Sequence, residues 1–164
     1  MVNVETLQRF SIFSGMDPDV LESIARISMV QTYRAMEQCM VEGEEAENLF
    51  ILMKGRMIVK RHLSQSWLHA EGITDAVVDT VREGEVFGWS AVVQPTIRTA
   101  SVWCAEDCEV IAMSGKEFVA IMDKHPEVGY VFMKRLAAVI ASRLARTVER
   151  LSTMTAEVET FKVT

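Results

Sequence analysis

One stretch of the chain, Arg82 to Val102, combines residue types that could bind an anion. It contains two glycines, Gly84 and Gly88, and an arginine, Arg98, ten residues after the second glycine. A glycine lets the backbone approach a ligand closely, and a helical turn after it offers unpaired N–H groups and a positive dipole end. Arg98 would add a permanently charged fork of donors. The stretch therefore predicts a phosphate site made of a short helical turn and one arginine.

The overall charge of the chain limits its partners. The 164 residues carry 17 basic and 23 acidic side chains, a formal net charge of −6, and the pI is about 5.1. This balance argues against non-specific binding to the DNA backbone. No apolar run approaches the roughly 18 residues that mark a membrane span, and no basic stretch followed by an apolar one indicates a signal peptide. We therefore expect a cytoplasmic protein that does not enter a membrane.

Cysteines and histidines are too few and too scattered to predict a metal site or catalysis. The cysteines are Cys39, Cys104 and Cys108, and the histidines are His62, His69 and His125. An odd number of cysteines fits reduced thiols better than a disulfide framework, and two thiols flanking a turn do not make a zinc site. We read Cys104 and Cys108 as buried apolar residues that could face each other across a hairpin. No nucleophile and base form a recognisable motif, so we expect no enzyme and no cofactor.

The hydrophobic pattern predicts helices at both ends of a β domain. Residues 6–13 and 17–28 show helical spacing, and Asp17 followed by Pro18 is a helix start. Residues 30–110 contain short β-branched and aromatic runs broken by turn signals, a pattern typical of a jelly roll. Between His62 and Val77 we expect a long hairpin connection, whose Trp67 and Leu68 either cover a pocket or pack on the roll. The fold class is mainly β with flanking helices.

The last part of the chain predicts one short and one long helix. The short helix follows Gly115 and ends before Pro126, where the long helix begins. Apolar residues then recur with 4-3 spacing at Met133, Ala137, Ile140, Leu144, Thr147, Leu151, Met154, Val158 and Phe161. Such spacing is the seam of a coiled coil, and it predicts a parallel homodimer. Docking of the stripe on the chain's own β domain would explain only its first turns. We therefore divide the chain into a β-roll domain, residues 1–125, and a coiled-coil helix, residues 126–164.

Together these features resemble the cyclic nucleotide-binding domain family, which includes the catabolite activator protein and the regulatory subunits of protein kinase A. The resemblance rests on the roll glycines, the turn "FGWSA", the sequence "RTASV" and the long helix, and it covers residues 7–151. It implies a double-stranded β-helix (β-roll) fold. It also implies that the cyclic phosphate of cAMP or cGMP binds the amides of the short helix and the arginine. The implied ligand-binding residues are Phe87, Gly88, Trp89, Ser90, Ala91, Arg98, Thr99 and Thr147.

Position 89 departs from the family pattern. The resemblance places there a glutamate that accepts the ribose 2′-hydroxyl, and this chain has Trp89 followed by Ser90. An indole donates but does not accept a hydrogen bond, so the loss of the carboxylate should weaken binding by about 1.5–3 kcal/mol. Alternatively, Trp89 fills the sugar pocket and excludes nucleotides. Thr147 has two readings as well, contact with the base or a polar seam position that sets helix pairing.

Two functional hypotheses follow. In the first, a dimeric sensor binds a cyclic nucleotide and transmits its occupancy through the hinge before Pro126 into the long helix. In the second, Trp89 closes a degenerate site and the protein is a homodimeric interaction module. The resemblance also implies a helix-turn-helix domain after the long helix, and the sequence stops at Thr164, so we expect no direct DNA binding. The sequence does not identify a protein partner.

Overall fold

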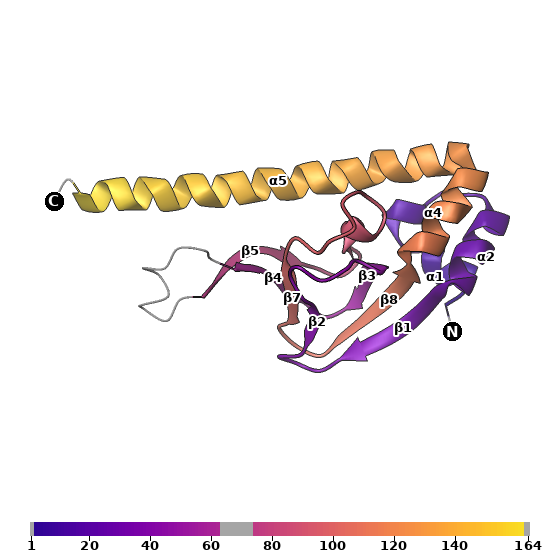
Figure 1. Cartoon of the computed structure of the whole chain (residues 1–164), viewed down its shortest axis with the longest axis horizontal. Coiled ribbons are helices and arrows are strands. Elements are labelled where there is room, and N and C mark those ends of the chain that lie inside the picture. The colour runs from indigo at the N-terminus through magenta and orange to yellow at the C-terminus, as the bar shows by residue number, and fades with distance from the viewer. Residues whose placement is uncertain (1, 63–73, 163–164) are drawn as a thin grey trace.

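A computed structural model of the chain describes residues 2–62 and 74–162. Its shorter helices gather at one end of a β-roll, and a long helix runs along the roll (Figure 1). The first elements are helix α1 (Val4–Gln8), the 3₁₀ turn η1 (Ser11–Phe13) and helix α2 (Pro18–Arg26). The helix predicted over residues 6–13 is thus two shorter pieces, whereas the helix predicted from residue 17 is confirmed and ends at Arg26.

Local capping explains where α2 begins. The Asp17 side chain accepts a hydrogen bond from the N–H of Asp19 at 2.8 Å, and Pro18 occupies the first helical position. The carboxylate satisfies an amide that has no partner within the helix, and the proline ring presets the helical φ angle. The sequence therefore sets this boundary through two neighbouring residues.

Eight strands form two four-stranded antiparallel sheets. The strands are β1 (Ser28–Tyr33), β2 (Gln38–Met40), β3 (Asn48–Lys54), β4 (Met57–His62), β5 (Asp75–Val81), β6 (Val86–Phe87), β7 (Ser101–Cys104) and β8 (Cys108–Ser114). One sheet has the order β1-β8-β3-β6 and the other the order β2-β7-β4-β5. The jelly-roll fold class is confirmed. The predicted hairpin between β4 and β5 is present, and Trp67 and Leu68 lie outside the described residues.

Side-chain alternation along β3 divides the hydrophobic core in two. Leu49 and Ile51 pack in a cluster shared with the helices, whereas Phe50 and Leu52 pack in a cluster between the two sheets. Successive residues of a strand point to opposite faces, so one strand serves both clusters. Residues next to β3 therefore contact either the roll interior or the helices, depending on the face they occupy.

The predicted hairpin at Cys104 and Cys108 is wrong. The two cysteines end β7 and begin β8, but β7 pairs with β2 and β4, and β8 pairs with β1 and β3. The turn between them crosses from one sheet to the other. Both thiols are buried and free, in agreement with their prediction as apolar core residues.

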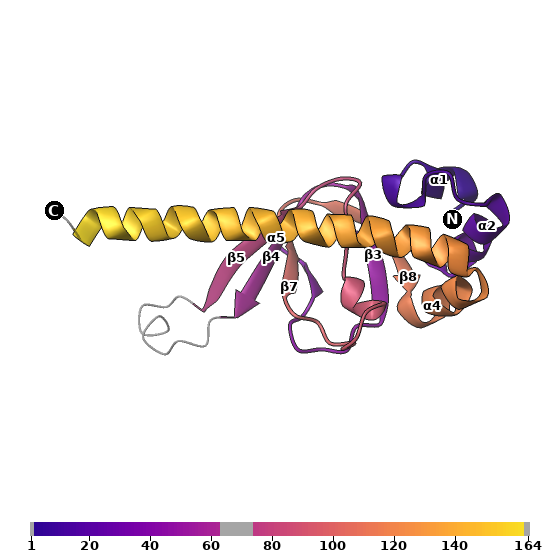
Figure 2. The same cartoon turned by 90° about the horizontal axis from the view of Figure 1, so that it is seen from above.

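The chain continues through helix α4 (Gly115–Lys124) into helix α5 (Pro126–Lys162). Seen from above, α5 crosses the roll and continues beyond it (Figure 2). Its buried inner residues are Val128, Phe132 and Leu136. The predicted seam residues Met133, Ala137 and Leu144 are exposed, and Ile140 and Thr147 are half-buried. Ile140 also packs against the cluster shared with the helices, so the seam borders the face that docks on the roll. The side chains from Leu151 onward that continue the seam lie outside the described residues.

No helix in residues 2–62 and 74–162 is both long and apolar enough to cross a membrane.

Candidate anion-binding site

The predicted short helical turn is present directly after β6. Gly88 has φ of 73° and ψ of 26°, and the 3₁₀ turn η2 (Trp89–Ala91) follows it. A Cβ atom at position 88 would lie 2.8 Å from Nη1 of Arg98 and 2.9 Å from Cδ2 of Phe50. Both the left-handed backbone and the close approach therefore require glycine here.

Arg98 is buried against that turn, with 6% of its surface exposed. Its Nη1 donates to the carbonyl oxygen of Gly88 at 2.9 Å, and its Nη2 donates to the carbonyl oxygen of Asn48 at 2.7 Å. Its guanidinium carbon lies 5.5 Å from the ring centroid of Phe50. Among the described residues, no carboxylate lies within 4.0 Å of this guanidinium. Burial lowers the pKa of Arg98, as desolvation does for any cation.

A cavity of about 230 Å³ opens beside Arg98. Its described lining is Gln31, Tyr33, Cys39, Met40, Val41, Glu44, Glu45, Glu47, Asn48, Phe50 and Arg98. Burial raises the pKa of the Cys39 thiol to about 11, so this thiol is neutral near pH 7. The glutamates are exposed at the rim, and Arg98 is the one cation in this described lining. The cavity thus has an acidic entrance and a positive inner wall.

A larger cavity of about 480 Å³ lies elsewhere, between η1 and α5. Its described lining includes Arg135 and Arg146 but not Arg98 or the η2 turn. The size of a cavity therefore does not identify the candidate site. The positions of Gly88 and Arg98 identify it.

Trp89 points toward the helices rather than into the cavity of Arg98. Its indole packs against the cluster shared with the helices, and the guanidinium carbon of Arg143 lies 4.9 Å from its ring centroid. Trp89 is absent from the described lining of the Arg98 cavity. The alternative in which this indole fills the pocket is therefore not favoured by its position.

The remaining predicted site residues fall into two groups. Phe87 stacks on Phe50 with ring centroids 5.0 Å apart, and Ala91 is buried in η2 beside the half-buried Ser90. Thr99 is exposed and does not contribute to the described lining. Thr147 lies on α5, where its hydroxyl donates to the carbonyl oxygen of Arg143 at 3.0 Å. The structure thus brings Phe87, Gly88 and Arg98 together, exposes Thr99 beside Arg98 and places Thr147 on α5.

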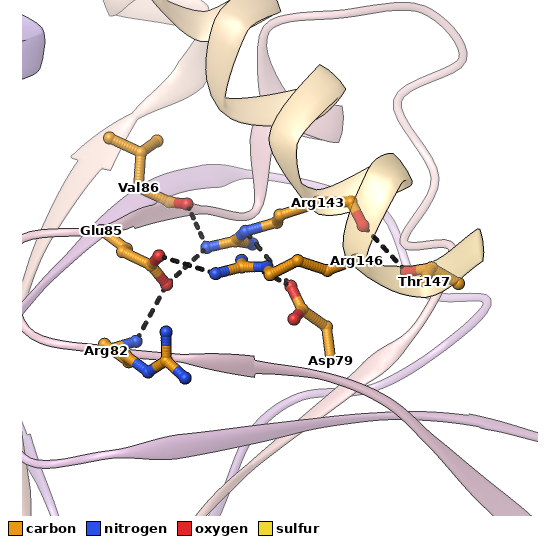
Figure 3. A network of polar contacts seen from close by, with 7 residues as sticks. All are labelled: Asp79, Arg82, Glu85, Val86, Arg143, Arg146 and Thr147. Atoms are coloured by element: carbon orange, nitrogen blue, oxygen red, sulfur yellow. Dashed lines mark hydrogen bonds and ion pairs between the residues drawn. The ribbon is translucent and has the colours of Figure 1, made fainter. Parts of the chain in front are cut away.

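A network of charges beneath α5, of which Arg143 and Asp79 are buried, was not predicted (Figure 3). Arg143 is 7% exposed and donates from Nη2 to the carbonyl oxygen of Val86 at 2.8 Å. Its Nε lies 3.4 Å from Oδ2 of Asp79, and its Nη2 lies 3.5 Å from Oε2 of Glu85. Arg146 pairs with the same two carboxylates, each at 3.3 Å. We call these four residues the α5 clamp.

The clamp differs from what the charge pattern of α5 indicates in the sequence. The arginines at positions 143, 146 and 150 are spaced like a solvated helix flank, which is how a charge run is usually read. Arg150 is exposed, but Arg143 and Arg146 contact β5 and the turn before β6. Burial lowers the pKa of Arg143, while Glu85 and Asp79 oppose that shift. Their partners lie about sixty residues away, so local charge spacing carried no signal for them.

The model of the cyclic nucleotide-binding domain family matches residues 30–125. A relative from Bradyrhizobium diazoefficiens, glutaminase 2, is 26% identical over 82% of this chain and 20% of its own length. A CRP-like cAMP-activated global transcriptional regulator from Mycobacterium tuberculosis is 21% identical over 90% of this chain and 61% of its own. The chain therefore spans about a fifth and about three fifths of these two curated relatives.

Solved structures share the fold. The crystal structure of a "putative cyclic nucleotide-binding protein" from Geobacter metallireducens superposes with a TM-score of 0.75 at 24% identity, covering 88% of this chain and 99% of the other. At this identity the superposition shows a shared fold alone.

Proposed function

We propose that this chain, which belongs to the cyclic nucleotide-binding domain family, binds a cyclic nucleotide at Arg98 and acts as a sensor module. The observation that carries the proposal is the buried guanidinium of Arg98, which has two carbonyl partners and no carboxylate within 4.0 Å among the described residues. A buried charge without a counter-ion costs free energy, which an entering phosphate would offset. The η2 turn beside it would supply backbone donors.

The proposal names cAMP as the first ligand to test and cGMP as the second. The mycobacterial relative is described as cAMP-activated, which supports cAMP. The lack of a carboxylate at position 89 predicts weaker binding than a site with the family's glutamate, by roughly ten- to a hundred-fold. The acidic rim at Glu44, Glu45 and Glu47 would also slow the entry of an anion, more so at low salt.

The proposed sensor signals as a homodimer through α5. The seam residues Met133, Ala137 and Leu144 are exposed on α5, which leaves them available to a second copy. No catalytic step, cofactor or direct contact with DNA belongs to the proposal. A cytoplasmic location and the division at residues 125 and 126 are predictions that the proposal retains.

The alternative, a degenerate interaction module, requires a closed nucleotide pocket. In this alternative Trp89 would close the pocket, but its indole lies beneath the guanidinium of Arg143. We therefore keep this alternative only as an outcome of the test.

The test is calorimetric titration of the purified protein with cAMP and cGMP. We expect saturable binding by the native chain and a loss of about ten- to a hundred-fold in affinity for Arg98→Ala. Arg82→Ala, an exposed arginine in the same stretch, is the matched control and should leave affinity within about two-fold. Thermal unfolding of each variant verifies that it is folded.

A third variant, Trp89→Glu, separates the two functions. Silence of the native chain with both nucleotides, together with binding by Trp89→Glu, would favour the degenerate module. Equal binding by the native chain and Arg98→Ala would place the ligand elsewhere and end the proposal.

A further inference from the structure

The cassette turn and α5 are connected through the residue that departs from the family pattern. The Gly88 carbonyl that accepts from Nη1 of Arg98 belongs to the peptide that also carries the N–H of Trp89. A ligand that draws the guanidinium toward itself would weaken this 2.9 Å bond and act directly on the backbone of Trp89. A change at Arg98 on ligand binding would therefore reach Trp89 through a single hydrogen bond.

The other end of the connection is a desolvated cation on α5. The guanidinium carbon of Arg143 lies 4.9 Å from the Trp89 ring centroid, and Arg143 is 7% exposed. Cation–π attraction is stronger when the cation is desolvated, and burial desolvates Arg143. A glutamate at position 89 would offer no aromatic face, so this contact exists because of the substitution.

Arg143 also holds the strand that leads into the turn. Its Nη2 donates to the carbonyl oxygen of Val86, two residues before Gly88, and Asp79 and Glu85 fix its orientation (Figure 3). One α5 side chain thus contacts the backbone before Gly88 and the side chain after it. Displacement of α5 and displacement of the η2 turn are therefore mechanically linked.

We propose that the contact of Trp89 with Arg143 carries the coupling between the anion site and α5. The inference rests on the proposed function for its ligand, but the Trp89 contact with α5 exists without one. Because coupling between two sites is reciprocal, an anion that shifts the turn changes the anchoring of α5, and loosening α5 changes the affinity for the anion.

The first experiment measures hydrogen exchange of the α5 amides around residue 143 in the ligand-free protein. Trp89→Leu keeps an apolar side chain but removes the aromatic face, and we expect it to increase opening of this segment by about two- to thirty-fold. Trp89→Phe keeps a ring and should retain most of the protection. The control is Trp103→Leu on β7, which removes a ring whose centroid lies 5.4 Å from Nζ of Lys60. It should leave exchange of the α5 amides unchanged.

The second experiment repeats the exchange measurement with saturating cAMP. We expect cAMP to alter exchange of α5 in the native chain and in Trp89→Phe. At a cAMP concentration that calorimetry shows to saturate Trp89→Leu, exchange of α5 in that variant should stay unaltered. Binding of cAMP with the same α5 response in Trp89→Leu would overturn this inference and leave the proposed function standing. If the native chain binds neither nucleotide, the proposed function fails, and the ligand-free comparison alone decides the Trp89 link. Identical α5 exchange in Trp89→Leu and the native chain would refute it.

Discussion

Arg98 shows why one side chain can suit both an empty and an occupied site. Its two carbonyl partners satisfy its donors without neutralising its charge. A carboxylate partner would bind the cation more tightly and compete with an incoming phosphate, because both present paired oxygens to the guanidinium fork. Neutral partners are exchanged at lower cost, so this arrangement keeps the arginine ordered and available.

The close packing of Gly88 against Arg98 predicts that an alanine at position 88 destabilises the fold. Gly15→Ala introduces a side chain at φ of 68° into open space, and it should cost about 1–2 kcal/mol from the backbone alone. Gly88→Ala has a similar φ, but its Cβ would meet Nη1 of Arg98. We expect Gly88→Ala to lower the free energy of unfolding by about 1 kcal/mol more, in urea titrations, and to weaken nucleotide binding. Equal losses in the two variants would show that the close approach is unimportant.

Contacts between residues close in the sequence could be predicted, and contacts between distant residues could not. Gly88 and Arg98 are ten positions apart, and their meeting at the η2 turn followed from a short-range pattern. The direction of the Trp89 indole did not, because the contact that orients it comes from Arg143, on a helix that follows the roll. Asn48 contributes only its backbone carbonyl oxygen, which every residue has, so its residue type did not indicate this role.

Among the elements, α5 is attached to the roll by two chemically different contacts. Its first turns bury Val128, Phe132 and Leu136 in the cluster shared with the other helices. Further along, attachment passes to the α5 clamp, where two arginines meet two carboxylates. Buried ion pairs add little net stability over apolar packing but are costly to break on one side. The α5 clamp therefore fixes the position of α5 on the roll more than it adds to the free energy of unfolding.

Removal of one clamp carboxylate tests that distinction. We expect Asp79→Asn to lower the free energy of unfolding by about 3 kcal/mol, because Arg143 would keep its charge in a buried place with one carboxylate fewer. Glu22→Gln breaks the exposed pair between Glu22 and Arg26 and should cost less than about 1 kcal/mol. Urea unfolding of both variants measures the difference, and similar small losses would mean that the clamp is as weak as a surface pair.

Periodicity predicted the elements better than their connections. The start of α2, the hairpin between β4 and β5, and the start of α5 all followed from local signals. The turn from Cys104 to Cys108 has the residues of a hairpin turn, yet it joins strands of different sheets. Sheet membership is decided by pairing with distant strands, which local turn chemistry does not encode.

For the whole molecule, the exposed seam on α5 predicts its assembly. Leu144 is 63% exposed in the single chain, a large apolar side chain in the middle of the heptad pattern. Two copies packing in parallel would bury it and its seam neighbours without disturbing the inner face of α5. The roll and the clamp would then use successive turns of the inner face of α5, and the dimer would use the exposed seam beside that face.

Sedimentation of Leu144→Lys checks this assembly. We expect the native chain to sediment as a dimer of 18.5 kDa subunits at micromolar concentration and Leu144→Lys to shift toward monomers, because the charge would be buried in the seam. Val77→Lys changes a side chain on β5 that is 53% exposed and should remain dimeric. A native chain that sediments as a monomer would contradict the parallel seam.

The stacking of Phe13 on Phe132 has a consequence for synthesis. These rings lie with centroids 6.0 Å apart, although 118 residues separate them in the chain. At about 5–20 residues per second, a ribosome takes roughly 6 to 24 seconds to progress from one to the other. During that interval the apolar side chains of η1 and α2 lack the helices that cover them in the finished protein. The apolar surface of η1 and α2 therefore stays uncovered until α5 has been synthesised.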